Sequence, residues 1–498
     1  MSTSGAASAA PFRVEREMMM SDEHFETLSL EQESADDHEM ALRHAPLIRF
    51  DAREPFLPSV VGYTVFRNEE IESPSFPRTL TLPEGAVCGI EYAVWWDWDI
   101  QHLYELEHIW VYLDDAEQVI AADASWHGGY HQMVDASGNV PLQDGRVILY
   151  SEPGKHAFAP VADWLAEREP ITRGGCGIHA GKGGVLVTDL FEGYIDDRNP
   201  INNQVVWTYL ERRTFEPAFT FSRIFDLSQV PHVPWNNLFE WIPGRVTWWA
   251  QFLNEQTPAS QRRVIRIAHR GASAYAQENS LTAIRKAAEM GSDMVEVDVR
   301  ITVDHVPVII HDENLQRVFG VSGSVSDFTL DELIAMTPDG LEPIMSLEAL
   351  IDACRSLHIG LYLDIKQVSP QSLPRMVTTL REKGMLNAAI FGSFRPDILA
   401  EIKALEPKAQ TSILFSSTHV EPVALAQSVG CDYVHPCWER FDQPHELLTE
   451  EWLGAVRGAG LGIICWHEER PAVIYELQQR GVNGICSDEP ELLLPRDS

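Results

Sequence analysis

From residue 263 onward the chain repeats one pattern, in which a short apolar run is followed by a polar loop and then by an amphipathic stretch. The runs have the length of strands and the stretches have the period of helices, so the pattern predicts parallel strands joined by helices. Eight runs within about 230 residues match a (β/α)8 barrel in size. An open doubly wound sheet is the alternative. The barrel is favoured because polar residues follow several runs, at the end of the strands where barrel sites are built. The predicted strands are 264–268, 294–299, 306–310, 360–365, 388–391, 410–415, 431–435 and 461–466, and the predicted helices are 280–290, 347–357, 373–383, 396–405 and 472–480.

The first half of the chain has a different texture, with aromatic and apolar runs broken by Pro, Gly and Asn. Eleven of the fourteen tryptophans precede residue 261, which favours two separately built domains. We therefore expect a β-rich, Trp-rich accessory domain over 46–260, built as a sandwich, and the barrel over 261–498. Residues 1–45 are acidic with few aromatics, and we expect a disordered tail there. The predicted strands of the first domain are 86–94, 107–113, 146–150 and 205–210.

The formal net charge of the chain is −36 at pH 7. Such a charge argues against binding to the phosphate backbone of nucleic acid, although it allows a local basic pocket for one phosphate. Residues 1–20 lack the apolar core of a signal peptide, and no run of 18 apolar residues occurs. We therefore expect a cytoplasmic protein without a transmembrane segment.

Two carboxylates lie two residues apart in the second predicted strand, in the order Val295-Glu296-Val297-Asp298-Val299. Because side chains alternate across a strand, Glu296 and Asp298 should face the barrel interior while the valines pack under the helices. Carboxylates crowded in an apolar interior repel one another, and a hard divalent cation relieves that repulsion. Asp364 and Lys366 repeat the same-face spacing and offer a third oxygen ligand and a cation for a phosphate. A buried ion-pair network is the alternative.

Two histidines follow predicted strands, His269 after 264–268 and His311 after 306–310. Imidazole exchanges a proton near neutral pH. Cleavage of a phosphodiester needs one proton removed from the nucleophile and another given to the leaving alkoxide, so two histidines suit it. Arg270 adds a planar fork that fits phosphate oxygens. A single histidine at a strand end is more often a hydrogen-bonded core residue, but the constellation indicates phosphoester hydrolysis.

With these residues in this order, the chain from about residue 264 to 495 resembles the glycerophosphodiester phosphodiesterases. Single motifs of this kind are weak, whereas so many in one order are specific. The motifs that carry the resemblance are His269-Arg270-Gly271, Glu278-Asn279-Ser280, Glu296-x-Asp298, Pro307-Val308-x-x-His311-Asp312, Asp364-x-Lys366, Ser393-Phe394, Trp466 and Gly481-Val482-Asn483-Gly484-Ile485-x-Ser487-Asp488-x-Pro490.

The resemblance implies a (β/α)8 barrel that hydrolyses glycerophosphodiesters to glycerol 3-phosphate and an alcohol, with a divalent cation (Mg2+ or Ca2+). Asp364 stands where glutamate is more usual, Gln277 where proline is common and His467 where threonine is common, which leaves substrate detail and metal preference open. The implied roles are metal binding by Glu296, Asp298 and Asp364, acid and base catalysis by His269 and His311, phosphate binding by Arg270 and Lys366, and support of these groups by Glu278, Asn279 and Trp466.

Residues 96–160 are distantly similar to the β-sandwich of necrosis- and ethylene-inducing-like proteins. The similarity lies in an acidic and histidine-rich stretch before a strand, and in a later His127-Gly128-Gly129-Tyr130 segment. It allows a second metal site in the first domain, and a polar network in a Trp-rich core is the alternative. The candidate ligands are His102, Glu107, His108, His127 and His131.

Two other functions compete with hydrolysis of small glycerophosphodiesters. A lysophospholipase D-like enzyme would use the same residues beneath a wider apolar mouth. A lipid- or glycan-binding protein would use the Trp-rich domain and keep the barrel as a scaffold, but a passive barrel has no need of two histidines and three acidic ligands. The expected partner is a small-molecule substrate, and the sequence leaves the oligomeric state open.

Overall fold

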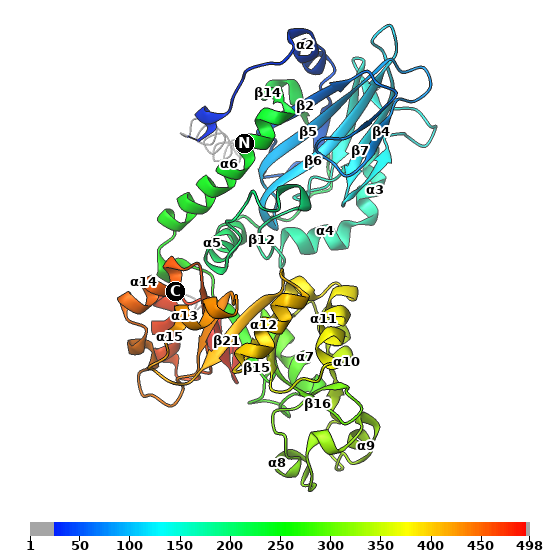
Figure 1. The fold of residues 1–498 in the computed structure, drawn as a ribbon. Helices are drawn as coiled ribbons and strands as arrows, with labels where there is room; N and C mark the ends of the chain where they lie inside the picture. Colours follow the sequence, from blue (N-terminus) through cyan, green and yellow to red (C-terminus); the bar gives the residue numbers. More distant parts are fainter. Residues whose placement is uncertain (1–23, 495–498) are drawn as a thin grey trace, which may run out of the picture. The chain divides into compact units, whose positions relative to one another are not determined.

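The computed structural model describes residues 24–494. The chain forms two compact units (Figure 1): the first contains the described residues up to 198 together with 205–257, and the second contains 199–204 and 258 onward. No helix between residues 24 and 494 is long and apolar enough to cross a lipid bilayer.

The second unit is a closed barrel of parallel strands, as predicted. Its ring follows the order β15, β16, β19, β20, β21, β22, β23 and β24, and pairing of β24 with β15 closes it. Hydrogen bonds around the whole ring leave no open sheet edge, which excludes the doubly wound alternative. The strands are β15 (Ile265–His269), β16 (Met294–Ile301), β19 (Gly360–Ile365), β20 (Ala389–Ser393), β21 (Gln410–Phe415), β22 (Tyr433–Pro436), β23 (Gly462–Cys465) and β24 (Gly484–Ser487).

One predicted barrel strand was wrong. The run 306–310 forms β17 (Pro307–Ile309), which pairs antiparallel with the end of β16 and with β18 (Met345–Ser346), outside the ring. The turn between β16 and β17 spans only 302–306, and a parallel pair needs a crossover of a dozen or more residues. The eighth strand of the ring is β24, which the predicted strands did not include.

Alternation along β16 separates two cores. Val295, Val297 and Val299 pack into the layer between strands and helices, whereas Ile267, Tyr362 and neighbouring side chains fill the barrel interior. Glu296 and Asp298 therefore face the interior, on the opposite side from the valines. In Figure 1 α10, α11 and α12 lie outside the strands. The barrel helices are α7 (Leu281–Glu289), α10 (Leu347–Leu357), α11 (Ser372–Glu382), α12 (Pro396–Leu405), α13 (Pro422–Ser428), α14 (Glu450–Gly458) and α15 (Pro471–Gln479).

The segment between β17 and β18 forms a small helical subdomain. It contains α8 (Gln316–Phe319), η5 (Val325–Asp327) and α9 (Leu330–Ala335). These helices bury their own cluster of apolar side chains against residues of the hairpin. His311 and Asp312 lie where the hairpin enters this subdomain.

The first unit is β-rich, and two sheets share one hydrophobic core. One sheet has the order β11, β10, β1, β13, and the other has β14, β2, β5, β6, β7, β8; β2, β5, β6 and β7 lie side by side in Figure 1. The first sheet comprises β1 (Leu47–Phe50), β10 (Arg146–Ser151), β11 (Phe158–Ala159) and β13 (Arg223–Asp226), and the second comprises β2 (Val60–Phe66), β5 (Cys88–Trp98), β6 (His102–Leu113), β7 (Val119–Trp126), β8 (Gly129–Gln132) and β14 (His232–Pro234). The smaller strands are β3 (Glu70–Glu72), β4 (Thr79–Thr81), β9 (Leu142–Gln143) and β12 (Gly184–Val185).

One predicted strand of the first half is a helix in the structure. The run 205–210 was predicted as a strand but lies in α5 (Pro200–Glu211), because Asn199 Oδ1 accepts from the backbone N–H groups of Ile201 and Asn202 and starts a helix. A β-branched and aromatic run of this length does not distinguish strand from helix by period. The α6 helix (Trp235–Gln256) packs on β2, where a Cβ on Gly62 would lie 2.8 Å from Leu238 Cδ2.

The predicted tail over 1–45 is only partly open to comparison, since residues 1–23 lie outside the described residues. Between 24 and 45 the structure differs from the prediction. The α2 helix (Ala35–Arg43) begins at Ser34, whose side chain accepts from Asp37 N, and it buries Ala41 in the core of the first unit. The acidic residues occupy the solvent side and the first turn of a capped helix, which composition alone did not reveal.

Candidate active site

Three buried carboxylates meet inside the barrel. Asp298 on β16 and Asp364 on β19 are register partners, and Glu296 lies two residues before Asp298. All three side chains are fully buried, and one oxygen atom from each lies within 4.8 Å of the others. Within the described residues, Glu296 Oε1, Asp298 Oδ1 and Asp364 Oδ1 accept no hydrogen bond. Buried oxygens that accept no hydrogen bond, of which Asp298 Oδ1 has only an ion pair with Lys366, converge from two strands and form an oxygen-rich cluster that suits a hard divalent cation.

Crowding perturbs the acidity of this cluster. Burial and the charge of Asp298 raise the pKa of Glu296 well above its ordinary value. Burial, opposed by Lys366, raises the pKa of Asp364 to about 6. Burial acts on Asp298 in the same direction, but the charges of Lys366, Arg270 and His311 hold the pKa of Asp298 below its ordinary value. Two of the three carboxyls thus resist ionisation because too little positive charge lies beside them.

Two cationic side chains border the cluster. Lys366 Nζ forms ion pairs with Asp364 Oδ2 and, at 3.1 Å, with Asp298 Oδ1. Arg270 has a left-handed backbone (φ 57°), its N–H donates to Glu296 Oε2 at 3.0 Å, and its Nε lies 3.4 Å from Asp298 Oδ2. Both side chains are mostly buried, with 15% and 17% of their surface exposed. They therefore present positive charge beside the acidic cluster.

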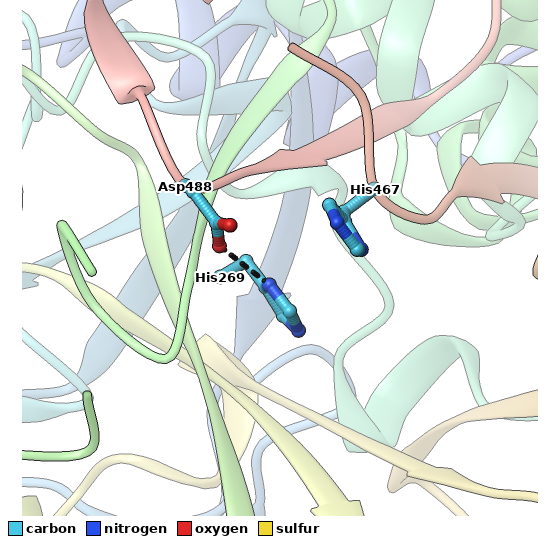
Figure 2. Close-up of side chains that lie close together, drawn as sticks. All are labelled: His269, His467 and Asp488. Carbon is cyan, nitrogen blue, oxygen red and sulfur yellow. Dashed lines mark hydrogen bonds and ion pairs between the residues drawn. The ribbon is translucent and has the colours of Figure 1, made fainter. Parts of the chain in front are cut away.

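His269 ends β15 and is held by a carboxylate from the far end of the chain. Its Nδ1 lies 2.7 Å from Asp488 Oδ1, across 219 residues of sequence, and Ser273 Oγ donates to the same oxygen. Figure 2 shows this pair together with His467, whose ring stacks on His269 at 4.6 Å. The other nitrogen, His269 Nε2, has no hydrogen-bond partner among residues 24–494 and lies 3.9 Å from Glu296 Oε2.

The surroundings of His269 act on its pKa in opposite directions. Burial lowers the pKa of His269, and the hydrogen bond with Asp488 acts against this effect. Burial acts to raise the pKa of Asp488, but its hydrogen bonds with His269 and Ser273, together with the charges of His269 and His467, outweigh burial and bring the pKa to about 2. Asp488 is therefore ionised and accepts from Nδ1–H, which leaves Nε2 as the nitrogen free to take a proton.

His311 lies beyond β17, on the hairpin outside the barrel ring. The N–H of Ile310 donates to Asp298 O at 2.9 Å, which holds this part of the hairpin beside the carboxylates. His311 Nδ1 lies 2.6 Å from Asp312 Oδ1, and 34% of the histidine side chain is exposed. Both predicted acid/base histidines thus pair through Nδ1 with an aspartate.

The residues expected to support the site also contact it. Asn279 Nδ2 donates to Asp298 Oδ2 at 3.0 Å, and its Oδ1 accepts from Asp298 N at 3.3 Å. Glu278 bonds Arg270, and the Trp466 ring lies 5.0 Å from the ring of His269. Sequence reasoning assigned no role to Asp488 or to Arg317, which bonds Glu278. Asp488 was visible only as part of the closing motif, and Arg317 gave no signal.

In the first unit the five predicted metal ligands do not meet at one point. His102 gathers with Asp99 and Glu105, whose ligand atoms lie within 4.8 Å of one another. Lys155 Nζ lies 2.9 Å from Asp99, and the Glu107 carboxylate accepts from Ser125 Oγ nearby. Asp99 and Glu105 were missing from the predicted ligand set, although both stood in the acidic stretch that suggested a site.

The other predicted histidines have partners of their own. His108 is buried, stacks against Trp110 and has a pKa lowered to about 3 by burial. His127 Nε2 pairs with Glu152 Oε2 at 2.6 Å, and His131 lies against the ring of Trp164. These three histidines therefore belong to separate contacts, and only His102 and Glu107 adjoin the acidic cluster.

Residues 269–492 match the glycerophosphoryl diester phosphodiesterase family. A glycerophosphodiester phosphodiesterase of Caldanaerobacter subterraneus subsp. tengcongensis is 27% identical over 239 residues, which are 46% of this chain and 95% of the relative. A putative glycerophosphodiester phosphodiesterase of Bacillus subtilis is 30% identical over 246 residues, which are 46% of this chain and 96% of the relative. A crystal structure of the Thermotoga maritima glycerophosphodiester phosphodiesterase is 28% identical, with a TM-score of 0.38 over 46% of this chain and 96% of that one.

Proposed function

Because the chain belongs to the glycerophosphoryl diester phosphodiesterase family, a family of enzymes, we propose that its barrel hydrolyses glycerophosphodiesters to glycerol 3-phosphate and an alcohol with the help of a divalent cation. The observation that carries the proposal is the convergence of three buried carboxylates and two histidine–aspartate pairs at one end of the barrel. An oxygen cluster beside two proton-transfer groups fits cleavage of a phosphodiester.

We assign the cation to Glu296, Asp298 and Asp364. The support is chemical, since each residue offers a buried oxygen that accepts no hydrogen bond within the described residues. Three carboxylate oxygens suit Mg2+ or Ca2+, because both cations prefer oxygen ligands. The residue types therefore do not distinguish Mg2+ from Ca2+. When bound, such a cation polarises a phosphoryl oxygen and so favours attack on phosphorus.

His269 and His311 would move the two protons of the reaction. Each is held at Nδ1 by an aspartate, so Nε2 is the atom that exchanges a proton with the substrate. A neighbouring glycerol hydroxyl would lose its proton to one histidine and attack phosphorus, while the other histidine protonates the departing alkoxide. The resulting cyclic phosphate would be opened by water with the two roles reversed.

Arg270 and Lys366 would hold the phosphate. Arg270 offers a planar guanidinium, and Lys366, directly after β19, offers a compact ammonium beside Asp364. Lys366 now pairs with Asp298 and Asp364. With those carboxylates engaged by a cation, its ammonium would be released towards a substrate phosphate, because like charges repel it from the cation.

The test is release of glycerol 3-phosphate from glycerophosphocholine, with EDTA or with added Mg2+ or Ca2+. We expect release that depends on the cation, and no release from several headgroups with cation present would refute the proposal. Lysophosphatidylcholine serves as the second substrate. Faster release of choline from it would favour the lysophospholipase D-like alternative, which uses the same residues.

His311→Ala tests the acid/base assignment. We expect turnover to fall by roughly a hundredfold or more, since loss of a positioned proton donor or acceptor costs that much. The side chain is 34% exposed, so the change should leave the melting temperature nearly unaltered. Activity close to that of the unchanged protein would show that another group transfers the proton.

For the first domain, 46–260, we propose a cation site at Asp99, His102 and Glu105, with Glu107 beside it. Three carboxylates there face one ammonium, that of Lys155, so negative charge is in excess. Burial and the charge of Glu105 raise the pKa of Glu107 well above its ordinary value, as expected where charge is uncompensated. The arrangement suits a divalent cation more than a neutral ligand.

The test uses the full chain with the barrel site disabled by Asp298→Asn and Asp364→Asn. Equilibrium dialysis with Mn2+ should then detect one bound ion, which His102→Ala should remove. His131→Ala is the matched control, because that histidine is exposed and contacts aromatic rings instead of the cluster. No bound ion before the His102 change would mean that Lys155 alone compensates the acidic residues.

A further inference from the structure

The side chain of Arg317 joins two carboxylates that are far apart in the sequence. Its Nη2 donates to Glu278 Oε1 at 2.7 Å and its Nη1 donates to Glu278 Oε2 at 3.0 Å. The remaining donor, Nε, bonds Asp312 Oδ2. The planar guanidinium thus uses one edge for one carboxylate and its inner N–H for the other, a geometry that a lysine cannot reproduce.

Each of these carboxylates contacts a residue assigned to the chemistry. The other oxygen of Asp312 lies 2.6 Å from His311 Nδ1. Both oxygens of Glu278 lie 3.3 Å from Arg270 Nη1. An unbroken series of polar contacts therefore runs from the acid/base histidine, through Arg317, to the arginine at the phosphate position.

The small subdomain fixes the backbone that carries Arg317. The residue lies on α8 between Leu315 and Phe319, which are 1% and 7% exposed in the subdomain core. The Arg317 side chain itself is 50% exposed. Two buried anchors on a short helix limit where the guanidinium can reach, which reduces the entropy lost when it holds two carboxylates.

We propose that Arg317 is a positioning residue that sets His311 and Arg270 in one arrangement before the substrate binds. It would do so by holding Asp312 against His311 and by sharing Glu278 with Arg270. The proposal rests on the proposed function, since it takes His311 as an acid/base group and Arg270 as a phosphate ligand. Arg317 touches neither the cation ligands nor the reacting atoms.

The charges of the contacts support this role. The hydrogen bond from Arg317 is the largest cause that brings the pKa of Asp312 to about 2, so Asp312 stays an acceptor for His311 Nδ1–H at any working pH. Glu278 divides its negative charge between two arginines. The positive charge of Arg270 is then neutralised less than if Glu278 paired with Arg270 alone, and more of it stays available for a phosphate.

Arg317→Met is the direct test, because it keeps the apolar stem and removes the fork. We expect kcat to fall roughly tenfold to a hundredfold, since small displacements of catalytic groups have effects of that size. KM should rise by a smaller factor. Arg317→Lys should recover part of kcat, as a single ammonium can hold one carboxylate. Arg381→Met is the matched control, because Arg381 is 51% exposed and pairs with Glu406, away from these residues.

A second measurement separates positioning from folding. Arg317→Met and Asp312→Asn should each lower kcat, and the double variant should be about as slow as the slower single variant, because both act through His311. Independent, multiplied losses would overturn the proposal, and so would a kcat for Arg317→Met equal to that of Arg381→Met. If Arg317→Met does not fold, Arg317→Lys decides: unchanged kcat overturns the proposal, and reduced kcat at an unchanged melting temperature supports it. An unchanged protein that releases no glycerol 3-phosphate would instead refute the proposed function.

Discussion

At the scale of single residues, the ionised form of the buried acidic cluster is unfavourable without additional positive charge. Glu296 and Asp364 have raised pKa values because burial and mutual repulsion disfavour their charged forms. A cation bound by these carboxylates, as proposed, would therefore have to replace protons. In the cation-free protein Asp364, whose ordinary pKa is 3.8, contributes stability that is complete below about pH 4 and is lost as the pH rises through about 6.

Cation binding should consequently weaken as the pH falls. The rise in melting temperature on adding Ca2+ or Mg2+ should be largest above pH 7 and should shrink below about pH 6, where Asp364 takes up a proton. Asp364→Asn should remove the rise at every pH. Asp352→Asn, an exposed change on α10, should leave it intact. An equal rise at pH 5 and pH 8 would contradict the assignment of the cation to these carboxylates.

Sequence periodicity could place some of these residues but not others. Glu296 and Asp298 share a face because the side chains of a strand alternate. This holds for any strand that contains both residues, whatever the fold around it. The contact of His269 with Asp488 joins the first and last strands of the ring, so it appears only once the barrel has closed. The contact of Arg317 with Glu278 depends on the backbone of the small subdomain, whose sequence has no periodic pattern that predicts its fold.

At the scale of elements, the connection between β15 and α7 shows how tightly the site loop is held. Gly271 has φ 80°, and a Cβ there would lie 2.7 Å from Ala283 Cβ and 2.8 Å from Ala283 C. Two requirements coincide at this residue, a left-handed backbone and contact of the loop with the helix. The same loop carries Arg270, whose backbone N–H donates to Glu296.

Gly271→Ala should therefore lower both stability and activity. The left-handed backbone alone costs about 1–2 kcal/mol for alanine, and the clash with α7 should add about 1–3 kcal/mol. Gly291→Ala is the matched control, since Gly291 has φ 76° but its nearest neighbour atom lies 3.7 Å away. Thermal unfolding and kcat of both variants would be compared. Equal losses would show that the contact with Ala283 does not constrain the loop.

Element boundaries mark where sequence reasoning succeeded and where it failed. The repeat of strand and helix predicted the barrel, because parallel strands buried on both faces give continuous apolar runs. The same criterion counted β17 as a ring strand, although the short turn before it already required an antiparallel partner. It missed β24, and α5 was mistaken for a strand because the signal for its start lay at Asn199.

At the scale of the whole molecule, the net charge of −36 sets the long-range field that a substrate meets. A negative protein repels an anion, and salt screens this repulsion over roughly 10 Å at 0.1 M. The proposed phosphate ligands, Arg270 and Lys366, act only at short range. Headgroup charge should therefore influence the rate of capture apart from any contact inside the site.

This field gives a prediction that compares two substrates. For glycerophosphoglycerol, which carries one net negative charge, kcat/KM should rise a few fold as KCl increases from about 10 to 200 mM. For glycerophosphocholine, whose charges cancel, it should change little. A matching salt response for both substrates would show that the net charge of the chain does not govern their encounter.

The hairpin of β16 and β17 places two groups of candidate site residues on different parts of the chain, one on a strand of the ring and one outside it. Glu296 and Asp298 belong to the ring, whereas His311 follows β17, which pairs with the end of β16 and with β18 outside the ring. An exchange of the segment 302–346 would thus replace the proposed proton-transfer residue His311 and Arg317 without shifting the register of any ring strand. The proposed proton-transfer residue His311 and the proposed cation ligands could therefore change independently of each other in evolution.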